Sequence, residues 1–215
     1  FFFKQKTAYE IKECDWSSDV CSSDLAVVAC GAIATHISNI ASRENFDITI
    51  YPLPPLLHNH PEKIAGEVDT KIQEIKDKHS KIAVAYSDCG TYGALDEIIK
   101  KYGIQRLGGD HCYDVFAGKQ KVFELTTTGT YFFTDYLVKS FNRSVVVELG
   151  LDKRPELVDD YFKNYEKVVW LAQNLTEELK AAAESAAALM KLPLEIEVVG
   201  ESGLLDELKR LLNHI

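Results

Sequence analysis

The sequence predicts an α/β protein in three layers, with a largely parallel sheet and helices on both of its faces. Short runs rich in Val, Ile and Ala alternate with longer segments whose apolar residues recur at helical spacing. The strand-like runs are apolar almost throughout, as expected of a sheet that is covered on both sides. No linker rich in Pro, Gly or Ser divides the chain. We therefore expect one compact α/β domain over residues 25–215, with two Rossmann-like lobes as the alternative.

The first half alternates between four predicted strands and three predicted helices. The strands are expected at 25–30, 47–53, 81–89 and 104–109. The helices are expected at 31–42, 61–79 and 94–103. In the second helix, Ile64, Val68 and Ile72 lie at helical spacing. Pro61 suits the first turn of that helix, and Gly103 suits the C-cap of the third.

The second half shows the same alternation of strand-like and helix-like segments. Strands are expected at 144–150, 167–174 and 194–200. Helices are expected at 130–141, 155–165, 176–189 and 204–212. Pro155 suits a first helical turn, and Thr176 is a good start for the Ala-rich helix. This order of strand and helix predicts parallel strands joined by helical crossovers.

Residues 1–24 are interpreted as foreign to the protein. The stretch shows neither a helical nor a strand period, and it lacks the apolar centre of a signal peptide. Residues 4–10 and 15–24 can be back-translated into the two constant parts of a short-read sequencing adapter. We therefore exclude residues 1–24, as an adapter-derived segment, from the fold prediction.

Charge and cysteine content exclude several classes of protein. The formal net charge is −9, and about −7 remains without residues 1–24. Such an acidic chain is not expected to bind nucleic acid, which requires a basic surface. No apolar run reaches the ~20 residues of a membrane helix, so no membrane association is expected. Outside residues 1–24 three cysteines remain, an odd number that cannot form a complete disulfide framework, so a cytoplasmic location is predicted.

These three cysteines, Cys30, Cys89 and Cys112, each follow a predicted strand. Ligands of open parallel sheets bind outside the carboxyl ends of the strands, so we expect the three thiols to lie along one edge. His111 could add a fourth ligand. Three sulfurs and an imidazole suit zinc, whereas three thiolates with one weakly held position suit an iron–sulfur cluster. The alternative is that the cysteines are buried and chemically inert.

Four further residues near the predicted edge are weaker candidates. His58 follows a Pro pair and could act as acid or base, the alternative being an exposed loop histidine. Asp88 is a second catalytic candidate, although it could simply cap the following helix. Tyr86 and Tyr113 flank the cysteines and could hydrogen-bond a cofactor, the alternative being aromatic packing.

Seven segments in order resemble the family catalogued as domain of unknown function 1638. They are VVACGAIA, LPPLLHNHPEKI, VAYSDCGTYGALDEI, GGDHCYDVFAG, GTYFFTDYL, ELGLDKRPEL and YEKVVWLAQ. The family pattern includes the three cysteines, which this sequence retains. The family is common in anaerobic archaea and bacteria, and its genes often neighbour corrinoid-dependent methyltransferases. The resemblance implies no established activity. It favours a metal site over inert cysteines without choosing the metal, and the gene neighbours point to one-carbon methyl transfer.

Three hypotheses follow for function. The first is a cytoplasmic metalloprotein that acts on a small-molecule substrate through an iron–sulfur cluster or zinc. The second is a non-catalytic accessory protein that supplies metal or corrinoid to a partner methyltransferase or corrinoid protein. The third is a metal-free thiol enzyme with one cysteine as nucleophile and His111 as base. The metal hypotheses require all three thiols together, whereas the third requires one.

Overall fold

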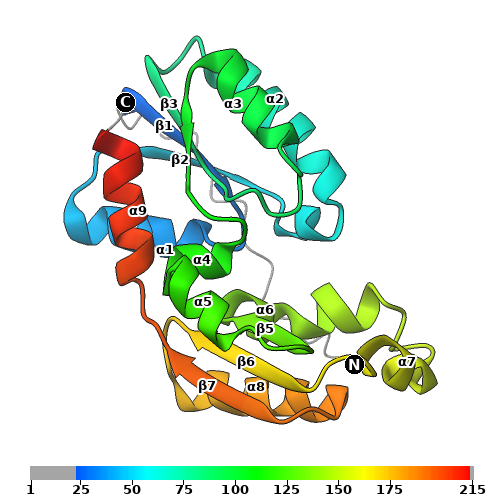
Figure 1. Cartoon of the computed structure of the whole chain (residues 1–215). Helices are drawn as coiled ribbons and strands as arrows, with labels where there is room; N and C mark the ends of the chain where they lie inside the picture. Colours follow the sequence, from blue (N-terminus) through cyan, green and yellow to red (C-terminus); the bar gives the residue numbers. More distant parts are fainter. Residues whose placement is uncertain (1–22, 214–215) are drawn as a thin grey trace, which may run out of the picture.

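The computed structural model describes residues 23–213 and divides them between two lobes, each built on a parallel sheet (Figure 1). In the first lobe the strand order is β2-β1-β3-β4, and all neighbouring strands are parallel. The chain adds β2 on one side of β1 and later strands on the other, so the winding reverses between β1 and β3. The strands are β1 (Leu25–Cys30), β2 (Thr49–Leu53), β3 (Lys81–Ala85) and β4 (Gln105–Arg106).

Helices cover both faces of the first sheet. α2 and α3 lie together on one face, and α1 and α9 lie on the other (Figure 1). The helices are α1 (Ala34–Glu44), α2 (Pro61–Ile75), α3 (Ala94–Tyr102) and α9 (Ser202–Asn213). Leu204, Leu208 and Leu211 of α9 are fully buried in the same core as β1. The last helix of the described chain therefore belongs to the first lobe.

The second lobe holds a three-stranded parallel sheet in the order β5-β6-β7. Its two faces pack on different helices. Phe133 and Trp170 face the core formed with α6 and α8, while Phe132 and Val169 face α4 and α5. The strands are β5 (Thr130–Thr134), β6 (Lys167–Ala172) and β7 (Leu194–Val198). The helices are α4 (Cys112–Ala117), α5 (Lys119–Leu125), α6 (Asp135–Phe141), α7 (Val158–Phe162) and α8 (Glu177–Met190).

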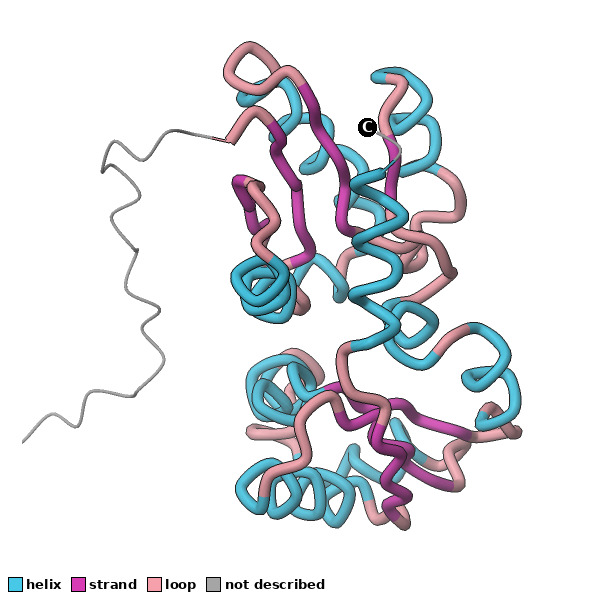
Figure 2. Tube along the Cα trace, turned by 90° about the vertical axis from the view of Figure 1, so that its left-hand side faces the viewer, coloured by secondary structure: helices cyan, strands magenta, loops and turns pink. Residues whose placement is uncertain are grey.

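The chain crosses between the lobes twice. It enters the second lobe through α4 and α5 and returns through the turn between β7 and α9 (Figure 2). At this return, Gly203 approaches α4 so closely that a Cβ would lie 2.5 Å from the carbonyl oxygens of Val115 and Phe116. Asn59 Nδ2 also donates to the carbonyl of Ser144, which joins a loop of the first lobe to the second.

The predicted α/β class is confirmed, and the parallel strands form two sheets rather than one. Two predictions in the second half are wrong. Residues 130–141, predicted as one helix, begin with β5, because Thr134 caps α6 by accepting the N–H of Leu137. Residues 144–150, predicted as a strand, continue from α6 as a helical turn that buries Val145 and Val146. An apolar run of this length does not by itself distinguish a strand from a buried helical segment.

The described chain begins just before β1. Of the segment interpreted as adapter-derived, residues 1–22 lie outside the described residues. Ser23 Oγ donates to the carbonyl of Asp47, and Asp24 accepts the backbone N–H of Ser80. These bonds join the two residues to the loops that precede β2 and β3.

Candidate functional site

The three cysteines lie at the carboxyl edge of the first sheet. Cys30 is the last residue of β1, Cys89 lies in the loop after β3, and Cys112 is the first residue of α4. β1 and β3 are the neighbouring strands between which the winding of the sheet reverses. A reversal of this kind opens a crevice at the strand ends, which is the usual ligand site of open α/β sheets.

The thiols share one electrostatic environment. Burial raises the pKa of Cys30 to about 11, against hydrogen bonds from the backbone N–H groups of Ala32 and Ile33. The pKa of Cys112 is raised well above its ordinary value, first by burial and then by negative charge on Cys89 and Cys30. Each thiolate thus disfavours the next, so a cation is needed to hold several of them ionised together.

His58 is the histidine that the structure brings to the thiols. It lies in a 3₁₀ turn, η1 (Pro55–Asn59), and both of its ring nitrogens are 3.8 Å from Cys30 Sγ. Its Nδ1 lies 3.2 Å from the carbonyl oxygen of Pro55. A proton on Nδ1 satisfies that carbonyl and leaves Nε2 as the free nitrogen. Burial lowers the pKa of His58, but the hydrogen bond and charge of Cys89, with the Pro55 carbonyl, outweigh burial and raise it.

Tyr86 lies one residue past β3 and is completely buried. Its ring stacks on that of His58, with centroids 6.2 Å apart and planes 18° from parallel. Burial raises its pKa, and the charges of Cys30 and Cys89 raise it further. Although the hydroxyl lies beside Cys30, it has no hydrogen bond of normal geometry. A buried hydroxyl without a hydrogen-bond partner is uncommon in proteins.

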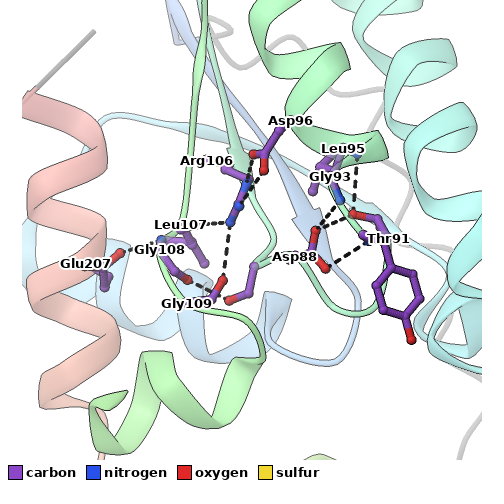
Figure 3. A network of polar contacts seen from close by, with 12 residues as sticks. Asp88, Thr91, Gly93, Leu95, Asp96, Arg106, Leu107, Gly108, Gly109 and Glu207 are labelled. Atoms are coloured by element: carbon purple, nitrogen blue, oxygen red, sulfur yellow. Dashed lines mark hydrogen bonds and ion pairs between the residues drawn. The ribbon is translucent and has the colours of Figure 1, made fainter. Parts of the chain in front are cut away.

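The loop that carries Cys89 is held by Asp88 (Figure 3). The carboxylate of Asp88 accepts hydrogen bonds from Thr91 Oγ1 and from the backbone N–H groups of Tyr92 and Gly93. Burial works to raise the pKa of Asp88, but these bonds outweigh it and lower the pKa. Asp88 thus shapes the turn before α3. Cys89 itself has φ +51°, a left-handed conformation that is uncommon outside glycine and often marks functional loops.

The loop that leads to Cys112 is held from two sides (Figure 3). Arg106 pairs with Asp96 of α3 and donates to the carbonyls of Leu107 and Gly109. From α9, Glu207 accepts the N–H of Gly108 at 2.8 Å. The thiol loops are therefore anchored by ion pairs that the spacing of the sequence does not reveal.

His111 and Tyr113 point to other surroundings. His111 is exposed, its ring lies 5.7 Å from that of Tyr113, and none of its described contacts joins it to a thiol. Tyr113 packs on Phe132 of β5, with ring centroids 5.1 Å apart. Burial raises the pKa of Tyr113, and the charge of the adjacent Cys112 raises it further.

The arrangement is a set of neighbouring ligands rather than a closed cage. Within residues 23–213, no three side chains of His, Cys, Asp or Glu lie close enough together to enclose a metal ion as they stand. Cys30 is buried, whereas Cys89 and Cys112 are half-buried. The same residues can act as soft metal ligands or as a thiol–imidazole pair.

A protein-family model described as "Protein of unknown function (DUF1638)" matches residues 52–212, which include His58, Cys89 and Cys112. No curated protein and no solved structure matches the chain. Within residues 23–213, none of the helices has the length and apolar character that a membrane crossing requires.

Proposed function

Since the chain belongs to the DUF1638 family, whose description gives no activity, we propose its function from the geometry of the thiol site. The protein is a cytoplasmic metalloprotein in which Cys30, Cys89 and Cys112 bind an iron–sulfur cluster or zinc. One observation supports this proposal: three thiols and an imidazole, carried by β1, η1, the loop after β3 and the start of α4, lie at the carboxyl edge of the first sheet, where its winding reverses. A structural role in packing would not require so many thiols to share one edge.

The donor set fits a soft metal. Thiolates and imidazole are the ligands that zinc prefers, and thiolates hold iron–sulfur clusters. His58 supplies the fourth group better than His111, because its ring lies 3.8 Å from Cys30 Sγ and its Nδ1 also contacts the carbonyl of Pro55. Metal-binding histidines commonly show this carbonyl contact. When bound, the metal would act as a Lewis acid or electron carrier. The protein's own residues would fix its position and exclude water around Cys30.

A thiol enzyme is the second candidate, and one contact favours it. His58 lies close enough to Cys89 for that thiol to raise its pKa, and the carbonyl of Pro55 lies 3.2 Å from Nδ1 of the ring. A nucleophile beside a base that is itself oriented by a third group is the usual arrangement for activating a thiol. In this role His58 takes the place given to His111 by the sequence, and Cys89 is the nucleophile. Cys30 and Cys112 would then be dispensable for activity.

The test is anaerobic purification of the full chain, followed by metal analysis and a visible absorption spectrum. A brown protein with about four irons per chain would establish a cluster. Stoichiometric zinc without colour would establish the thiolate–imidazole site. Replacing any one of Cys30, Cys89 or Cys112 with Ser should then lower the metal content. A metal-free protein in which iodoacetamide rapidly labels Cys89 alone would instead support the thiol enzyme.

The same preparation separates an enzyme from an accessory protein. An enzyme needs an exchangeable coordination position for a small-molecule substrate, whereas a closed four-ligand site suits delivery or sensing. The accessory role, beside a methyltransferase or corrinoid protein, predicts that the metal passes to that partner on mixing. Retention of the metal, with a spectrum that changes on adding small ligands, would favour the enzyme.

A further inference from the structure

The hydroxyl of Tyr86 stands out among the polar atoms of the first core. Tyr86 is 0% exposed, and its hydroxyl is the one buried side-chain oxygen or nitrogen, among the described residues, that lacks a hydrogen-bond partner. Elsewhere in the described core, buried polar side chains such as Asp135 and Gln173 are fully engaged. The missing partner of Tyr86 is therefore specific to the thiol site.

The surroundings of this hydroxyl identify the acceptor. The ring is held in place by β3 below it and by the stacked ring of His58 beside it. The hydroxyl lies beside the sulfur of Cys30, whose ionised form the nearby backbone N–H groups of Ala32 and Ile33 also favour, the latter donating to the carbonyl of Cys30 at 3.0 Å. A protonated thiol is a weak acceptor, whereas a metal-bound thiolate is a strong one. The three donors together make a cradle for a negatively charged sulfur.

We propose that Tyr86 is a positioning residue that donates its O–H to the sulfur of Cys30 once that sulfur binds the metal. This inference rests on the metal site proposed above and adds a residue to it. A hydrogen bond to a ligand sulfur orients the ligand and withdraws electron density from it, and such outer contacts typically change metal affinity 10- to 100-fold. The unpaired hydroxyl is thus explained as half of a bond that metal binding completes.

The experiment compares the full-length wild-type chain with Tyr86→Phe, both freed of metal and titrated with Co²⁺ under anaerobic conditions. The variant should bind the same amount of Co²⁺ with about tenfold weaker affinity. Its sulfur-to-cobalt charge-transfer band should move to lower energy, because the thiolate loses a hydrogen bond. Affinity is measured by competition with a chelator, and the band is measured by absorption.

Thermal unfolding separates this role from simple packing. Without metal, Tyr86→Phe should be at least as stable as the wild type, because it removes an unpaired buried hydroxyl. With Co²⁺ it should be less stable. The matched control is Tyr51→Phe in β2, whose hydroxyl is already bonded to His79 at 2.8 Å. That control should be less stable in both states and should bind Co²⁺ with unchanged affinity.

Each of the other outcomes would contradict a specific part of the proposal. If the wild type binds Co²⁺ and Tyr86→Phe matches it in affinity and spectrum, the donor role is wrong while the metal site stands. Equal destabilisation of the variant with and without Co²⁺ would show a packing role only. If the wild type takes up no Co²⁺, the metal site fails, and the role of Tyr86 fails with it.

Discussion

The backbone N–H of Cys89 donates to the carbonyl of Asp110 at 2.8 Å. This bond joins the loop after β3 to the loop that enters α4, and the neighbouring bond from the N–H of Asp88 to the carbonyl of Gly109 reinforces it. The backbones on which Cys89 and Cys112 are mounted are therefore held together before any ligand binds. Because these two loops are already joined, ordering them would cost less entropy when a ligand binds the two thiols.

Replacing His58 should weaken metal binding more than replacing His111. We expect His58→Gln to lower Zn²⁺ affinity at least about tenfold, since it removes the nitrogen that faces the thiols. His111→Gln is the matched control and should leave affinity unchanged, because His111 is exposed. Competition titration with a zinc-binding dye measures both. The reverse order of effects would reinstate His111 as the ligand.

Glu207→Ala should loosen the loop that leads to Cys112. The change leaves the N–H of Gly108 without its acceptor, so the free energy of unfolding should fall by about 1–2 kcal/mol at neutral pH. The hydrogen bond from Arg210 lowers the pKa of Glu207, with the N–H of Gly108 adding to it against burial. The stabilisation is therefore complete above the unfolded value of 4.5 and is lost as pH falls through the lowered pKa.

Urea unfolding at several pH values measures the change in unfolding free energy. Amide hydrogen exchange at Gly108 reports directly how often the loop opens. Glu195→Ala is a suitable control, because its partner Lys167 lies in the second lobe. Exchange at Gly108 should be faster in Glu207→Ala and unchanged in the control. Unchanged exchange in both variants would show that Glu207 does not anchor the loop.

The metal-free protein should lose stability at alkaline pH through Cys30. Burial raises the folded-state pKa of Cys30 from 9.0 to about 11. The unfolded chain therefore releases the proton first as pH rises past 9, and the stabilisation declines until the pH reaches the folded pKa. The loss amounts to about 2–3 kcal/mol. Cys30→Ala should start from lower stability but show a shallower decline over this range in urea unfolding, whereas parallel curves would contradict the assignment.

Gly31→Ala should disturb the site through the backbone. A Cβ at Gly31 would lie 2.3 Å from the carbonyl oxygen of Leu53 and 2.8 Å from Cδ of Pro55. Because the neighbouring loop carries His58, we expect a loss of about 1–3 kcal/mol in unfolding free energy and weaker metal binding. Gly66→Ala in α2, where a Cβ meets nothing within 4 Å, should instead stabilise the protein by about 0.5–1 kcal/mol. Urea unfolding of both variants measures these changes in unfolding free energy.

Much of the first lobe could be predicted from local sequence because its signals are local. The apolar run before Cys30 forms β1, the helical spacing around Val68 forms α2, and Gly103 ends α3 with φ +64°. The elements of the second lobe are less well predicted from local sequence. The valines at 145 and 146 are buried either as a strand or as a helical turn, and only packing against the second core selects the turn.

Part of the site could also be predicted, because the position of a cysteine relative to a strand is a local signal. A cysteine at the end of a parallel strand must lie at the carboxyl edge, so the edge itself follows from the sequence. The choice between His58 and His111 does not, because it depends on how η1 folds back over β1. The carboxylate of Asp88 accepts from the hydroxyl of Thr91 and from the next two backbone N–H groups, and Tyr86 lacks a partner. Neither fact is visible without coordinates.

The return of the chain to the first lobe in α9 has a consequence for biosynthesis. The helix supplies buried leucines to the core of β1, and its Glu207 bonds the loop before Cys112. A ribosome makes this helix only after the whole second lobe has been translated, so a nascent chain presents its thiols on an unfinished core. If the chain binds the metal proposed above, we therefore expect metal insertion to follow translation, once α9 has packed on the first core.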